Sequence, residues 1–252
     1  LEFRRVLFRS NSVLVEGKLY KKNETVKTIQ TGIDGIATTT ADLLPYGKYK
    51  LEETKAPEGY LTDGAKAIEF SITENGKIVD LTDESHSIYN QIKRGDLEGV
   101  KIGAGTHKRL ANVPFKITSK TTGESHIVVT DKNGQFSTVS DWASHKKNTN
   151  VGKTSEDGIW FGTSEPDDSK GALLYDTYEI EELSCESNKG MKLIPAFEVV
   201  VSRNKVKIDL GTLTDEYGKE ITIHTTATDK ITGEKVIVAG KKVTIVDTVT
   251  LD

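Results

Sequence analysis

Residues 46–53 read YGKYKLEE, and residues 175–182 read YDTYEIEE. Each stretch leads through a polar segment to a run rich in aromatic and β-branched residues. These runs are AIEFSITENGKIVDL at 67–81 and AFEVVVSRNKVKIDL at 196–210. Apolar and polar residues alternate within them, which is typical of β-strands that bury one face. Because the parts occur in the same order twice, the sequence predicts two copies of one β-unit in tandem.

The rest of the chain favours the same structural class. VPFKITS at 113–119 and VTIVDTV at 243–249 are strand-like, and the dipeptides Asp34-Gly35 and Asn133-Gly134 indicate tight turns between strands. No long stretch has the periodicity of an amphipathic helix. We therefore expect an all-β protein built of tandem immunoglobulin-like or transthyretin-like β-sandwiches.

Composition and charge exclude several classes of partner. Hydrophobic residues make up 35% of the chain and charged residues 29%, and 34 basic residues against 38 acidic ones give a net charge of −4. Nucleic acids and anionic membranes both require a basic surface, so we predict no nucleic-acid partner and no membrane contact. The single cysteine, Cys185, cannot form an internal disulfide.

The pattern divides the chain into four parts. Residues 1–10 contain EFRRVLFRS, which reads like a translated sequencing adapter, and we leave them out of the fold prediction. Residues 11–93 are expected to form a first β-sandwich that lacks its N-terminal strand. Residues 94–217 are expected to form a second, with a polar insertion at 139–172. Residues 218–252 begin a third unit that is too short to bury a core alone.

A complete motif, Tyr-x-Leu-x-Glu-Thr-x-Ala-Pro-x-Gly-Tyr, runs from Tyr49 to Tyr60. It resembles the signature of collagen-adhesin B-type domains, the SpaA-like modules of Gram-positive pilins and adhesins. GDLEGVKI at 95–102 resembles the first strand of another such domain, and IHTTATDKITGEK at 223–235 resembles the opening of a VaFE-type repeat. The resemblance implies a stalk segment of an extracellular, cell-wall-associated surface protein, with neighbouring domains of the same chain as its partners.

The resemblance also implies an intramolecular isopeptide bond in the second unit. In such modules a lysine on the first strand bonds to an Asn or Asp on the last strand, and a glutamate on a middle strand promotes the reaction. The matching residues here are Lys101, Asp215 and Glu182, with Asp209 as the alternative acceptor. Strand alternation places Lys101 on the same face as Leu97, so its side chain is expected to point inward.

The other two units match their patterns only in part. In the first unit the resemblance assigns Glu53 and Asn90, and the strand that should carry the lysine is missing. In the third unit it assigns Thr225 as the donor of a Thr–Gln ester bond and Asp247 as the acid beside it, whereas the glutamine lies outside this sequence. We expect neither bond to form in this chain.

The insertion at 139–172 suggests an alternative function, a ligand-binding adhesin that contacts a host glycan or an extracellular-matrix protein. Trp142, Trp160 and Phe161 lie within this insertion, and we expect such aromatic residues to anchor it to the core. No nucleophile, phosphate-loop or paired-carboxylate motif indicates an enzyme. We predict no metal site and no cofactor, because the histidines lack metal-ligand spacing and are expected to be exposed. They lie at positions 86, 107, 126, 145 and 224.

Overall fold

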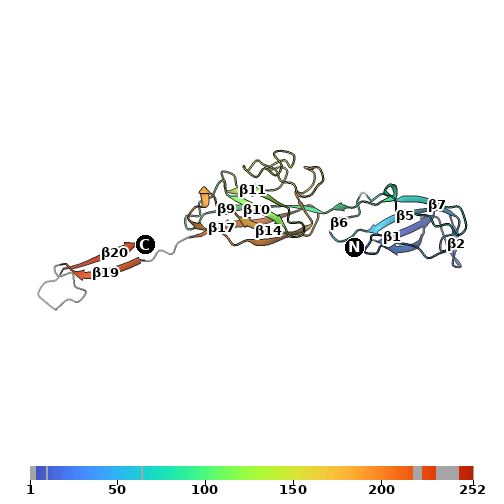
Figure 1. The fold of residues 1–252 in the computed structure, drawn as a ribbon, viewed down its shortest axis with the longest axis horizontal. Coiled ribbons are helices and arrows are strands. Elements are labelled where there is room, and N and C mark those ends of the chain that lie inside the picture. The colour runs from blue at the N-terminus through green and yellow to red at the C-terminus, as the bar shows by residue number, and fades with distance from the viewer. Residues whose placement is uncertain (1–3, 10, 64, 218–222, 231–243, 252) are drawn as a thin grey trace.

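The computed structural model describes residues 4–9, 11–63, 65–217, 223–230 and 244–251. Their regular secondary structure consists of β-strands and two single-turn 3-10 helices, η1 (Glu84–His86) and η2 (Glu186–Asn188), so the prediction of an all-β chain is confirmed. In this part of the chain, no helix is long and apolar enough to cross a membrane. Two sets of strands follow one another along the longest axis (Figure 1). We call them the first region (residues 4–93) and the second region (residues 94–217).

The first region contains a four-stranded antiparallel sheet and two smaller strand pairs. The sheet has the order β4 (Thr25–Gln30), β1 (Arg4–Arg9), β5 (Gly47–Lys55) and β7 (Ile68–Ile72). The smaller pairs are β2 (Val13–Val15) with β3 (Lys18–Tyr20), and β6 (Tyr60–Leu61) with β8 (Gln91–Ile92).

Strand β1 comes from residues that the sequence analysis left out of the fold. Leu7 on β1 is buried and lies opposite Leu51 on β5, and the two share a small core with Ile68 on β7. Val6 and Phe8 are of the β-branched and aromatic types enriched in strands, and Leu7 between them fills the core, which explains why this segment pairs with its neighbours. Whatever its origin, the segment Arg4–Arg9 is an inner strand of the sheet.

The second region contains two sheets that share one core. One sheet has the order β11 (Ser125–Val129), β10 (Pro114–Ser119), β14 (Asp176–Glu182) and β16 (Phe197–Val201). In the other, β9 (Arg94–Ile102) pairs with β17 (Val206–Thr214) along one edge, and with the short strands β12 (Gln135–Ser137) and β13 (Leu173–Leu174) along the other. β15 (Met191–Lys192) and β18 (Glu216–Tyr217) form a separate two-stranded sheet in this region. Leu97 and Phe136 from one sheet pack with Phe115, Ile117 and Tyr178 from the other.

The pairing of β9 with β17 brings the two ends of the second region together. The two strands are parallel, and Leu213 lies opposite Lys101 in their register. Every second residue of β9 from Leu97 to Lys101 is buried, as expected for a strand with one face toward the core. Residues just beyond β17 therefore lie beside the inward face of β9.

A compact junction joins the two regions. Gly59 has a φ of +86° and lies against the ring of Tyr175, where a Cβ atom would come within 2.7 Å of that ring. The Tyr175 hydroxyl donates to Glu58 at 2.8 Å, and Lys93 N–H donates to the carbonyl of Gly59. Contacts between residues far apart in sequence thus connect the motif of the first region to the start of the repeated motif in the second.

Strands β19 (Ile223–Asp229) and β20 (Ile245–Leu251) pair with each other in a two-stranded sheet. A two-stranded sheet has no second layer to cover its faces. Their described side chains are mostly exposed, including those of Thr225 and Asp247.

Candidate functional site

The structure brings Lys101, Glu182 and Asp215 together inside the second region. Lys101 Nζ lies 3.1 Å from Glu182 Oε2 and contacts Asp215 Oδ1 directly. All three side chains have zero exposed surface. These are the three residues that the sequence resemblance assigned, and we call them the buried triad.

Each member reaches the core through the regular geometry of its strand. Lys101 is on the inward face of β9, and Glu182 ends β14 on the face that buries Tyr178 and Ile180. Asp215 follows the last residue of β17, and its backbone N–H approaches the carbonyl of Ile102 at 3.4 Å. Three strands that are distant in sequence therefore converge on one point.

The triad holds two carboxyl groups and one amine away from water. Burial raises the pKa of Asp215, the contact with Lys101 lowers it and the neighbouring Glu182 raises it, and together these effects place it at about 6. Asp215 Oδ2 is buried and has no hydrogen-bond partner among the described residues. Two ionised carboxylates beside one ammonium would bury a net negative charge, which is costly, so the site favours keeping a proton on one carboxyl.

A fourth residue, Asn188 on η2, contacts the triad and was missed by the sequence analysis. Its side chain is buried, and its Nδ2 donates to Glu182 Oε1 at 2.9 Å. Asn188 lies in an irregular segment between strands, where strand alternation gives no information on which side chains point inward. No signal in the sequence identified it.

The alternative acceptor, Asp209, does not reach the triad. Its side chain is exposed, and its Oδ1 accepts a hydrogen bond from the Gly211 N–H at 2.8 Å. Ile208, the preceding residue on β17, lies partly buried against the core. Asp209 therefore points to solvent by strand alternation, and the suggestion that it could replace Asp215 was wrong.

The first region holds a related pair. Asn90 Nδ2 donates to Glu53 Oε1 at 3.0 Å, so the two residues assigned from sequence do lie together. Glu53 Oε2 and Asn90 Oδ1 are buried and lack hydrogen-bond partners within the described part of the chain. Lys18, on the hairpin of β2 and β3, has a side chain that is 65% exposed, and it pairs with Glu24. The pair thus matches two of the three positions of the triad.

The two residues assigned to the third unit lie on neighbouring strands. Thr225 on β19 is opposite Val249, and Asp247 on β20 is opposite Ala227. Both side chains are exposed. The structure therefore places Thr225 and Asp247 close in register without enclosing them in a core.

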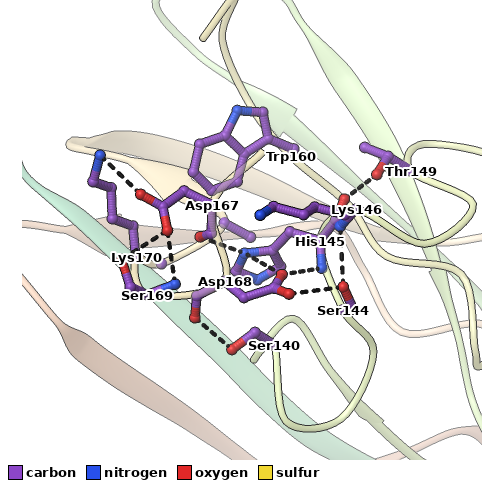
Figure 2. A network of polar contacts seen from close by, with 12 residues as sticks. Ser140, Ser144, His145, Lys146, Thr149, Trp160, Asp167, Asp168, Ser169 and Lys170 are labelled. Atoms are coloured by element: carbon purple, nitrogen blue, oxygen red, sulfur yellow. Dashed lines mark hydrogen bonds and ion pairs between the residues drawn. The ribbon is translucent and has the colours of Figure 1, made fainter. Parts of the chain in front are cut away.

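Residues 139–172 form irregular backbone with a buried polar centre (Figure 2). The ring of His145 is completely buried and the side chain of His126 is only 13% exposed, so the expectation that the histidines are exposed was wrong for these two. The His145 Nε2 lies 2.9 Å from the carbonyl of Thr138, and its Nδ1 lies 3.2 Å from the carbonyl of Asp167. The His145 backbone N–H donates to Asp168 Oδ1 at 2.8 Å, which ties both ends of the insertion together.

Arg94 fixes the insertion to strand β9. Its guanidinium lies 3.6 Å from the ring centroid of Trp160 and donates to the carbonyls of Phe161, Gly171 and Ala172. Burial lowers the pKa of Arg94 to about 10. Trp160 and Phe161 are buried, which confirms that they anchor the insertion, whereas Trp142 is 37% exposed. The insertion is thus packed into the second region.

The described residues contain no group of three or more His, Cys, Asp or Glu side chains arranged to hold a metal ion.

Comparison with protein families matches residues 15–85 to the SpaA prealbumin-like fold domain. No curated protein matches this chain. Among solved structures, the Bacillus anthracis TIE protein is similar at 16% identity and a TM-score of 0.48, with 98% of this chain and 40% of that chain covered. This chain therefore spans less than half of the TIE chain.

Two further similar structures come from pili. The C-terminal fragment of the pilus adhesin SpaC from Lactobacillus rhamnosus GG has 14% identity and a TM-score of 0.42, covering 88% of this chain and 91% of that one. The minor pilin GBS52 of Streptococcus agalactiae has 17% identity and a TM-score of 0.33, covering 86% and 84%. The similarity to these solved structures is low in both identity and TM-score, so the family match is the stronger finding. Residues 15–85 resemble a SpaA-type prealbumin-like domain.

Proposed function

We propose that this chain is a structural stalk segment of a pilin-like or adhesin-type bacterial surface protein, stabilised by an isopeptide bond between Lys101 and Asp215. The observation that carries the proposal is the buried triad, in which an amine and a carboxyl group touch inside an apolar core beside a second carboxyl. The SpaA-type match at residues 15–85 supports the same class of protein.

The proposed bond forms between Lys101 Nζ and Asp215 Cγ. The reactive state contains a neutral Lys101 amine and protonated Asp215 and Glu182, the same number of protons as an ammonium, a carboxylate and one carboxylic acid. The amine attacks Cγ, Glu182 donates its proton to the departing hydroxyl, and Glu182 then takes a proton from the nitrogen. One amide forms, one water leaves, and Glu182 ends unchanged.

The low polarity of the site favours this chemistry. A lysine is nucleophilic only when it is neutral, and burial disfavours its charged form. The raised pKa of Asp215 means that its carboxyl holds a proton at a higher pH than an exposed aspartate does. The direct contact between the two groups removes the need to bring them together, which is a large part of the barrier for a reaction in solution.

The bond would tie β9 directly to the segment that follows β17. β9 is the first strand of the second region and β17 is its last long strand, so a force applied along the chain would meet a covalent link before it could separate the two strands. We further propose that the first region and the second region are tandem sandwich modules, and that Thr225 and Asp247 belong to a further module of the ester-forming type. The function is extracellular and mechanical, and the single self-modification is not enzymatic turnover.

Pulling single molecules of the full chain from both ends tests this function. Lys101 and Asp215 are 114 residues apart in sequence, and in the wild type the segment between them is expected not to extend at forces that unfold the first region. Lys101→Met should release that segment, adding roughly 380 Å of contour length, because an extended chain spans at most about 3.3–3.6 Å per residue. Lys120→Met, a change at an exposed lysine on the same region, is the matched control. Release of the same length in the wild type would refute the mechanical role.

A further inference from the structure

The carboxyl group of Glu182 is held by contacts from two sides. Its Oε1 accepts a hydrogen bond from Asn188 Nδ2 at 2.9 Å. Its Oε2 lies 3.1 Å from Lys101 Nζ and accepts a longer hydrogen bond, 3.3 Å, from the Ile194 N–H. The two oxygens therefore have different neighbours, and the reactive amine faces Oε2.

The orientation of the Asn188 amide is fixed by its other contacts. The Cys185 N–H donates to Asn188 Oδ1 at 2.7 Å, which identifies the oxygen. Asn188 Nδ2 donates one hydrogen to the carbonyl of Leu183 at 3.0 Å and the other to Glu182 Oε1. Because both hydrogens are used and the residue is 1% exposed, the amide cannot turn without losing buried hydrogen bonds.

We propose that Asn188 is a positioning residue that fixes the proton of neutral Glu182 on Oε2, the oxygen that faces Lys101. A carbonyl oxygen is a better acceptor than a hydroxyl oxygen, so the shorter hydrogen bond from Asn188, 2.9 Å against 3.3 Å from the Ile194 N–H, favours the carbonyl role for Oε1 and the hydroxyl on Oε2. The Ile194 N–H is compatible with this arrangement, since a hydroxyl oxygen can still accept one hydrogen bond. The proton is thus held on the side of the carboxyl where the bond between Lys101 and Asp215 forms.

The inference rests on the isopeptide bond proposed above. It predicts that Asn188 increases the rate at which this bond forms. Without the amide, the proton could occupy either oxygen and the carboxyl could rotate away from the amine. Asn188 does not touch the reacting nitrogen or carbon in any contact of the described residues, so its effect is exerted through Glu182.

The test measures the rate of water loss by intact mass at successive times after the full chain refolds, with folding followed separately by tryptophan fluorescence. Asn188→Leu is expected to slow water loss in folded molecules by more than about tenfold, because a general acid out of place loses much of its contribution. Asn204→Leu is the matched control. Asn204 also bonds a backbone group, the Arg94 N–H, yet lies outside the triad. Its rate of water loss should equal that of the wild type.

A second variant, Asn188→Asp, has a side chain of nearly the same shape as asparagine, and its rate of water loss is expected to depend on pH. Its carboxyl can donate to Glu182 Oε1 only when protonated, so the ratio of its rate to the wild-type rate should rise as the pH is lowered from 8 to 5, whereas a purely structural role would leave that ratio constant. Wild-type rates in folded Asn188→Leu or Asn188→Asp across this pH range would overturn the inference. A wild type that never loses water would instead refute the isopeptide bond itself.

Discussion

Lys101→Met is expected to lower the free energy of unfolding of the second region by about 5 kcal/mol. The proposed bond closes a loop whose ends are 114 residues apart, and a cross-link around a loop of that size stabilises a fold by about 5 kcal/mol, chiefly by restricting the unfolded chain. Methionine is close to lysine in length and fills the same apolar space, so packing is largely kept while the amine is lost. Denaturant titration followed by the fluorescence of buried Trp160 measures the change.

The control for this variant is Lys120→Met, which removes a lysine from the surface of the same region. Lys120 pairs with Glu198 at 3.0 Å, but its side chain is 47% exposed, and surface ion pairs contribute little to stability. Its unfolding midpoint should match that of the wild type. Equal midpoints for Lys101→Met and the wild type would contradict a covalent link at this position.

Arg94→Met is expected to destabilise the second region by about 3–5 kcal/mol through a different mechanism. The guanidinium donates to the carbonyls of Phe161, Gly171 and Ala172. Methionine would leave the carbonyls of Phe161 and Gly171 without this donor, while the Ala172 carbonyl keeps the hydrogen bond from the Phe161 N–H. Each buried unsatisfied group costs about 1–3 kcal/mol. The stacking of the guanidinium on Trp160 would also be lost.

Hydrogen exchange separates this local effect from a global one. In Arg94→Met, amides of the insertion should exchange faster, including that of His145, which donates to Asp168 in the network of Figure 2. Lys147→Met, at an exposed lysine of the same insertion that pairs with Glu156, should leave exchange unchanged. Unchanged protection at His145 in Arg94→Met would show that the insertion does not depend on this anchor.

The regular strands explain how much could be predicted from the sequence. Alternation along β9 and β14 has a period of two, so the inward directions of Lys101 and Glu182 follow once the apolar neighbours are known. Asp215, which lies just beyond β17, was assigned from the family resemblance. The same rule, applied in the structure, turns Asp209 outward.

Irregular backbone explains what could not be predicted. Asn188 and His145 lie in segments without strand pairing, where burial depends on contacts between residues distant in sequence. In such segments the type of a polar residue does not show whether its side chain faces water or a buried carbonyl. Strand β1 was not predicted for another reason. Its residues resemble a translated sequencing adapter and were therefore excluded from the fold prediction.

The central claim is that Lys101 and Asp215 are joined, and the intact mass of the full chain tests it most directly. The wild type is expected to weigh one water less than its sequence. Glu182→Gln keeps the shape of the side chain but cannot exchange a proton, and it should restore the full sequence mass. Glu181→Gln changes the adjacent residue, which is partly exposed and pairs with Lys116, and it should still lack one water. A wild-type mass equal to the sequence mass would contradict the account.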